Sequence, residues 1–135
     1  MMIALPDFIQ KKAKQFLAEH NLEHVYDINC GLCEEFAKEC LANYPNGEIV
    51  DLGELYINDP FYQPENFQSL SEDERLKWIY DQDLPCHYAF LYEGKYYDAQ
   101  NYNGVEDWKE LDLMKYGQGQ MTRNEYISYK QLGLI

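Results

Sequence analysis

The chain has 135 residues, enough for one domain around one hydrophobic core, and no low-complexity tract or long linker marks a second domain. Its 24 acidic and 11 basic residues give a formal net charge of -13, which argues against partners that offer a phosphate backbone or an anionic membrane surface. We see no basic N-terminal leader and no stretch near the roughly 20 apolar residues of a membrane span, so we expect a cytoplasmic protein with reduced cysteines.

The N-terminal half is expected to contain two amphipathic helices. Apolar residues recur at helical spacing after Pro6 and again after Cys33, which predicts helices over residues 6–20 and from residue 33 to about residue 43. Residues 22–28 between them are predicted to be a partly extended connector. Residues 48–57 alternate apolar and polar side chains, with a glycine as a break, which favours one strand, or a strand and a bend.

The strongest β signal lies in the second half of the chain. Residues 85–92 and 95–100 predict the two arms of a hairpin, joined by a turn at Glu93 and Gly94. Before the hairpin, residues 58–68 contain two prolines and predict a loop, and residues 72–80 predict a short helix capped by a serine.

After the hairpin, residues 105–113 predict a short helix, and Thr122 or Asn124 can cap a last helix that ends near residue 132. The fold class expected from these elements is α+β. A small antiparallel sheet containing the hairpin should pack against the helix that begins at Cys33, with the other helices around it.

The stretch whose residues most clearly suggest catalytic chemistry is the start of the second helix. Counting from Cys33, apolar residues fall at the spacing of a helix buried on one side, so the cysteine lies in the first turn beside the inward face. Unpaired amide groups and the positive end of the helix dipole stabilise a thiolate there, although Glu34 and Glu35 oppose it. We therefore predict that Cys33 is a nucleophile.

A nucleophilic thiol needs a base, and His87 is the best placed of the three histidines because it falls in the predicted hairpin. Asp98 follows on the return arm. If Glu93 and Gly94 form a two-residue turn, Asp98 lies diagonal to His87 on the same face, about 7–8 Å away between backbones. A loop one residue longer would turn Asp98 to the opposite face.

The hypothesis is a triad in which Cys33 is the nucleophile, His87 the general base and Asp98 the group that orients the imidazole. Gln100 is the alternative partner of His87. The Cys33 amide and one further donor, for which Asn29 is a candidate, would stabilise an oxyanion.

Three short blocks carry a resemblance to a known family. They are Gly31-x-Cys33-x-x-Phe36-Ala37, His87-Tyr88-Ala89-Phe90 and Gly94-Lys95-Tyr96-Tyr97-Asp98-Ala99. Together they resemble the core of papain-like cysteine hydrolases, near the NlpC/P60 and transglutaminase-like groups, over about residues 29–104. The resemblance implies a papain-like core and a hydrolase or acyltransferase that acts on an amide or thioester of a protein, a peptide or a small amide, with no cofactor.

Other interpretations stay open. Cys30 competes with Cys33 as the nucleophile, because NlpC/P60 members usually carry Asp-Cys-Ser-Gly at this point and this chain does not. The pair Cys30-x-x-Cys33 also suggests a redox motif, and Cys30, Cys33, Cys86 and His87 include zinc-ligand types. Cys86 and His87, however, are neighbours on a strand and point to opposite faces, so we expect no metal site. The functional alternative is a non-catalytic, acidic binding or inhibitor domain of the same fold, of the kind a phage could encode.

Overall fold

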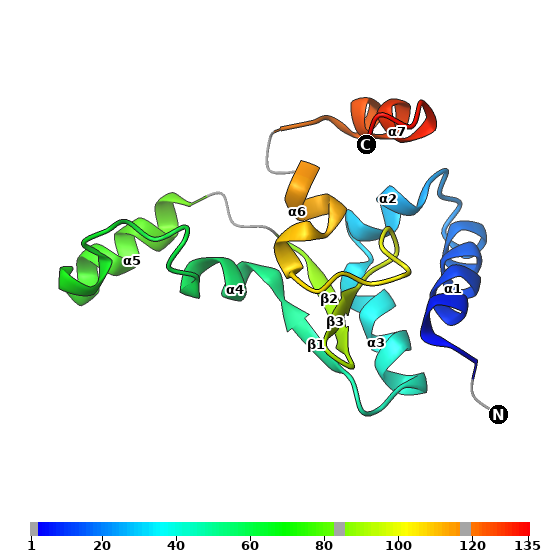
Figure 1. Cartoon of the computed structure of the whole chain (residues 1–135), viewed down its shortest axis with the longest axis horizontal. Coiled ribbons are helices and arrows are strands. Elements are labelled where there is room, and N and C mark those ends of the chain that lie inside the picture. The colour runs from blue at the N-terminus through cyan, green and yellow to red at the C-terminus, as the bar shows by residue number, and fades with distance from the viewer. Residues whose placement is uncertain (1–2, 83–85, 117–119) are drawn as a thin grey trace.

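The structure is a computed structural model that describes residues 3–82, 86–116 and 120–135. A three-stranded antiparallel sheet lies at its centre, in the order β1 (Glu48–Asp51), β2 (Tyr88–Tyr92), β3 (Lys95–Tyr97). Helices α1 (Leu5–Glu19) and α3 (Cys33–Asn43) lie on one side of it (Figure 1). The α+β class and the small antiparallel sheet packed against the cysteine helix are therefore confirmed.

Both faces of β2 are covered, because its side chains alternate between two apolar clusters. Phe90 faces a larger cluster with Ile9 and Phe16 of α1 and Phe36 of α3. Ala89 faces a smaller cluster formed by the chain before and after the hairpin. Its buried members are Leu52, Ala89, Trp108, Leu111 and Met114. The sheet is thus packed on both faces at the point where the hairpin begins.

The hairpin has the expected two-residue turn. Tyr92 pairs with Lys95, and the turn residues Glu93 and Gly94 have φ angles of 49° and 80°, as a type I′ turn requires. The pairing between β2 and β3 is shorter than the predicted hairpin. It ends at the pair of Phe90 with Tyr97, and the rest of each predicted arm does not pair with the other arm. Residue 85, the expected start of the first arm, is outside the described residues.

Three expectations for local structure are corrected. The connector over residues 22–28 contains a short helix, α2 (Val25–Asn29), because His24 and Asp27 form a capping box at its start. The strand expected over residues 48–57 stops at Asp51, whose carboxylate accepts hydrogen bonds from the amides of Gly53 and Glu54 and starts α4 (Leu52–Asn58).

The helix expected over residues 105–113 is a β-bridge between Val105 and Tyr96, a 3-10 turn η2 (Trp108–Glu110) and a short helix, α6 (Asp112–Tyr116). The first predicted helix is confirmed as α1, and the last as α7 (Arg123–Gln131), which Thr122 caps.

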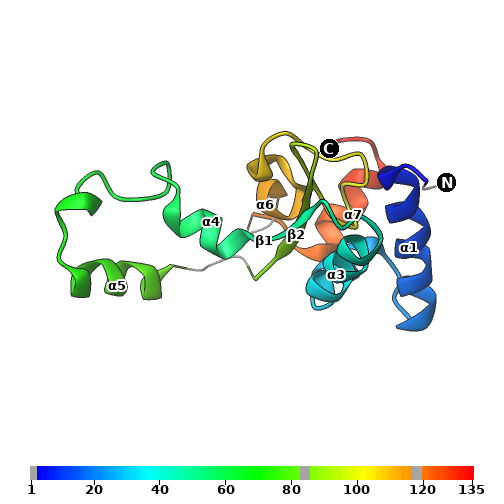
Figure 2. The ribbon, with the colours of Figure 1, turned by 90° about the horizontal axis from the view of Figure 1, so that it is seen from below.

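Residues 52–82 form an arm that projects from the body of the molecule. It consists of α4, a loop with the 3-10 turn η1 (Phe67–Ser69), and α5 (Glu72–Asp81), which was predicted over residues 72–80. Figures 1 and 2 show the arm leaving the sheet on the side away from α1. No residue of α5 is buried, so this outer part of the arm adds little to the core, whereas Leu52 at the root of the arm belongs to the smaller cluster. None of the helices in the described ranges is long and apolar enough to cross a membrane.

Gly47, which leads into β1, is a point where the fold tolerates no side chain. A Cβ at this position would lie 2.1 Å from Cζ of Phe90. We expect Gly47→Ala to lower the free energy of unfolding by about 1–3 kcal/mol through overpacking, measured by urea denaturation.

The cause of this loss can be isolated with a second substitution. Because Phe90→Leu removes the ring that Cβ would meet, the double variant should lose less stability than the sum of the two single variants. Strict additivity would contradict this explanation.

Candidate active site

Cys33 is the first residue of α3, as predicted. The preceding residue, Leu32, makes no side-chain cap, so the amide groups of Cys33 and Glu34 open the helix without a partner inside it. The cysteine is 8% exposed, and its Sγ lies 4.0 Å from the carbonyl oxygen of Cys86. The thiol therefore lies between a helix N-terminus and the segment that leads into β2.

His87 lies one residue before β2 and is fully buried. Its Nε2 is 2.9 Å from Oδ2 of Asp98, which follows the end of β3. The other carboxylate oxygen of Asp98 accepts hydrogen bonds from the backbone amides of Gln100 at 2.9 Å and Asn101 at 2.8 Å. A carboxylate held in this way can only accept, so Nε2 is the protonated nitrogen that donates to it.

The second ring nitrogen of His87 is left for the thiol. Among the described residues Nδ1 has no hydrogen-bond partner, and the thiol lies against the Cys86 carbonyl. The thiol and the ring are nevertheless close enough to change each other's pKa. Nδ1 is therefore the nitrogen that can take the proton from Cys33.

The electrostatics of this pair favour charge separation. Burial acts to raise the pKa of the Cys33 thiol, but His87, the Tyr88 amide and the Glu34 amide outweigh burial and leave that pKa below its ordinary value. For His87, burial acts to lower the pKa, whereas the hydrogen bond to Asp98 and then the Cys33 sulfur raise it to about 9. The shifts favour a thiolate beside an imidazolium near neutral pH.

A pocket of about 540 Å³ opens at the thiol. It is lined by Asn29, Cys30, Gly31, Cys33, Glu34, Glu35, Cys86, Tyr88 and Leu113. A ligand in this pocket would have access to the Cys33 sulfur and to the amides that begin α3.

The alternative residues lie close by, in different roles. Cys30 lines the same pocket but is exposed at the end of α2, and burial of its thiol raises its pKa, partly offset by Tyr26. The Gln100 side chain forms no hydrogen bond with His87, although both residues are described; its Oε1 accepts a hydrogen bond from Asn29 Nδ2 at 2.6 Å. One N–H of Asn29, the candidate oxyanion donor, is thus used by Gln100, and the unpaired amides of Cys33 and Glu34 at the start of α3 are further candidate donors.

A polar network behind Asp98 was not anticipated. Asn101, whose amide binds Asp98, also bonds Asp112 twice: its Oδ1 accepts from the Asp112 amide at 2.9 Å, and its Nδ2 donates to the carboxylate at 3.2 Å. The hydroxyl of Tyr126 donates to the same carboxylate, and Lys130 lies 3.1 Å from it. The C-terminal helix therefore braces the loop that holds Asp98. The only local signal was the sequence Asp98-x-x-Asn101, which is typical of a side-chain-capped turn.

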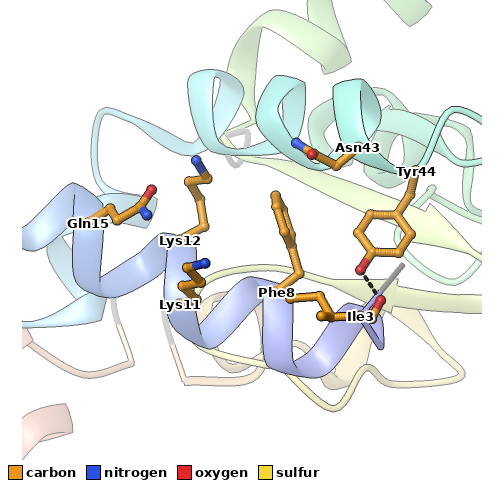
Figure 3. Close-up of a pocket in the computed structure, with 7 residues that line it drawn as sticks. All are labelled: Ile3, Phe8, Lys11, Lys12, Gln15, Asn43 and Tyr44. Atoms are coloured by element: carbon orange, nitrogen blue, oxygen red, sulfur yellow. Dashed lines mark hydrogen bonds between the residues drawn. The ribbon is translucent and has the colours of Figure 1, made fainter. Parts of the chain in front are cut away.

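A separate pocket of about 390 Å³ lies at the far end of α3, against the start of α1 (Figure 3). Phe8, Lys11 and Lys12 of α1 face Asn43 and Tyr44 there, and the Tyr44 hydroxyl donates to the carbonyl of Ile3. None of the predicted site residues lines this pocket. In the described ranges, no group of three or more histidine, cysteine, aspartate or glutamate side chains is arranged to hold a metal ion.

Comparisons of the chain with protein-family models, with curated proteins and with solved structures gave no match.

Proposed function

We propose that the protein is a cysteine-dependent hydrolase or acyltransferase that acts on amide bonds. The observation that supports this most strongly is the alignment of Cys33, His87 and Asp98. A thiol with a lowered pKa lies beside a buried imidazole, and the far side of that imidazole is 2.9 Å from a carboxylate. A helix N-terminus, a general base and an orienting carboxylate are the parts that thiol catalysis needs.

The proposed reaction has two halves. The Cys33 thiolate attacks the carbonyl carbon of an amide, and the amides of Cys33 and Glu34 stabilise the oxyanion. The C–N bond then breaks while the His87 imidazolium gives its proton to the leaving amine, which leaves a thioester on Cys33. Water or a second amine attacks this thioester, His87 takes the proton of that nucleophile, and the thiolate leaves with the electron pair of the C–S bond.

The finer fold assignment belongs to the same proposal. A cysteine at the start of a helix, a histidine beside a strand and an acidic residue after the next strand follow the order found in papain-like hydrolases. This order, together with the α+β arrangement of α3 on the sheet, supports a papain-like core near the NlpC/P60 or transglutaminase-like groups. As fold alone does not specify chemistry, the activity has to be tested at the site.

Acyl transfer to Cys33 can be tested without knowing the natural substrate. With p-nitrophenyl acetate at about neutral pH, we expect a burst of nitrophenolate approaching one equivalent and an acetyl group on Cys33 after acid quenching, located by peptide mass spectrometry. Cys30 and Cys86 are exposed comparators in the same molecule. Cys33→Ala should abolish the burst; acetylation that is equally fast at Cys30 or Cys86 would contradict the proposal.

A non-catalytic binding role is the second candidate, and the 52–82 arm favours it. Phe61 and Tyr80 on the arm are 78% and 83% exposed, which is unusual for large aromatic side chains in a domain with a well-packed core. If binding is the function, Cys33→Ala should capture a partner from a cell extract as well as the wild type does, while Phe61→Ala and Tyr80→Ala together should not.

A further inference from the structure

The pocket at Cys33 has a strongly acidic rim. Glu34 and Glu35 line it, and none of its lining residues in the described part of the chain is lysine or arginine. It is also more than an acidic patch. Nδ1 of the fully buried His87, which lines the neighbouring pocket, has no hydrogen-bond partner among the described residues, and the imidazole lowers the pKa of the Cys33 thiol. The carboxylates therefore surround a place where a reacting group would sit.

A second pocket of about 480 Å³ continues the acidic surface. It shares Cys86 and Tyr88 with the Cys33 pocket, and it is also lined by Asp51 and Glu54 at the root of the 52–82 arm. The two pockets thus flank the short segment from Cys86 to Tyr88. A chain laid across this segment would meet carboxylates on both sides of the reacting sulfur.

Little of this negative charge is neutralised by the protein. Glu34 pairs with Lys38 at 3.2 Å, but both side chains are well exposed, and such pairs are weak. Within residues 3–82, 86–116 and 120–135, neither Glu35 nor Glu54 forms an ion pair. The charges of Asp51 and then of Glu34 raise the pKa of the Tyr88 phenol, which indicates a negative field over the segment between the pockets.

Carboxylates in this position oppose the thiolate that the site otherwise favours. Their presence is explained if the ligand brings a compensating positive charge, which would screen the thiolate and be attracted to the rim at long range. We propose that the substrate carries a positive charge beside the carbonyl group that Cys33 attacks, and that it is a peptide segment with lysine or arginine next to the reacting amide. This inference rests on the proposed function and adds the class of substrate.

The test measures charge selectivity at Cys33 with two reagents that share a reacting group. Trimethylammonium-ethyl and sulfonato-ethyl methanethiosulfonate are compared on the full chain, with each rate divided by the rate for 2-mercaptoethanol. We expect the cationic reagent to modify Cys33 about tenfold faster at about 20 mM salt, and this preference to shrink severalfold near 0.5 M salt. Glu35→Gln should reduce the ratio by about two- to threefold.

Glu39→Gln is the matched control, because it removes the same charge from the same helix but lies outside both pockets, where Glu39 is 3.6 Å from Lys12. It should leave the ratio at Cys33 unchanged. In a second arm, a tripeptide amide with a central lysine should protect Cys33 from neutral iodoacetamide better than one with a central glutamate.

The outcomes separate this inference from the proposed function. If Cys33 reacts selectively with neutral iodoacetamide but shows no charge preference, or if the two peptides protect equally, the cationic substrate is refuted and the thiol enzyme remains. If Cys33 is no more reactive than Cys30 and Cys86 toward any reagent, the proposed function is refuted, and the substrate class is refuted with it.

Discussion

Replacing His87 with alanine is expected to slow the alkylation of Cys33 by iodoacetamide roughly 100-fold at about pH 6.5. In the wild type, His87 is the main group that lowers the Cys33 pKa against the effect of burial. Without the imidazole, burial acts alone and raises that pKa, so the thiolate fraction falls about tenfold for each unit of the shift.

The dependence of the alkylation rate on pH should also differ between the wild type and His87→Ala. In the wild type, Cys33 should be alkylated at pH values below the ordinary pKa of a thiol. The alkylation rate should change again near pH 9, where His87 loses its proton. In His87→Ala, we expect the alkylation rate to rise only once, above about pH 8.5, as the Cys33 thiol ionises. The rates are measured on the peptide that contains Cys33, with exposed Cys86 as an internal reference.

His20→Ala is the matched control, since His20 is an exposed histidine at the end of α1 and lines none of the pockets described above. It should leave the profile unchanged, and added imidazole should restore part of the reactivity of His87→Ala. If the pH dependence of Cys33 alkylation is identical in the wild type and in His87→Ala, His87 is not the base that activates Cys33.

Replacing Asp98 with alanine is expected to lower the free energy of unfolding by about 3–5 kcal/mol near neutral pH. The change leaves the fully buried His87 without the carboxylate that stabilises its charge. It also removes the acceptor of the Gln100 and Asn101 amides. Asp73→Ala, on the exposed first turn of α5, removes the same group and should change stability by less than about 0.5 kcal/mol.

The pH dependence follows from the raised pKa of His87. A histidine whose pKa is about 9 in the folded protein and about 6.5 in the unfolded one binds more protons when folded. The stabilisation that this shift contributes is complete below about pH 6.5 and is lost as the pH rises through about 9. The stability difference between the wild type and Asp98→Asn, from urea denaturation, should therefore narrow over this window; a constant difference would mean that His87 is not charged in the folded protein.

Local signals in the sequence were sufficient for much of the fold. The helix at Cys33, the helices that begin after Ser71 and Thr122, and the Glu93–Gly94 turn were all predicted close to where they occur. Each depends on hydrogen bonds between residues two to four positions apart, or on one stripe of apolar side chains. The positions of Cys33 at a helix start and of His87 beside the hairpin could be predicted for the same reason.

The errors arose where a short segment met a competing local bond or a tertiary contact. Residues 52–58 alternate as a strand would, but the carboxylate of Asp51 caps a helix there. The capping box at His24 was not recognised, because histidine is an uncommon cap. The arm over residues 52–82 could not be foreseen, since its direction depends on how β1 enters the sheet.

The sequence by itself determined an acidic α+β chain with a cysteine at a helix start and a histidine beside a hairpin, because charge, periodicity and turn chemistry act over a few residues. Only the tertiary structure decided which of the neighbouring groups meet. It placed Cys33 beside Cys86, 53 residues away, and set His87 against Asp98 while Gln100 lies against Asn29. These choices depend on side-chain packing of α3 against β2, which no short stretch of sequence encodes.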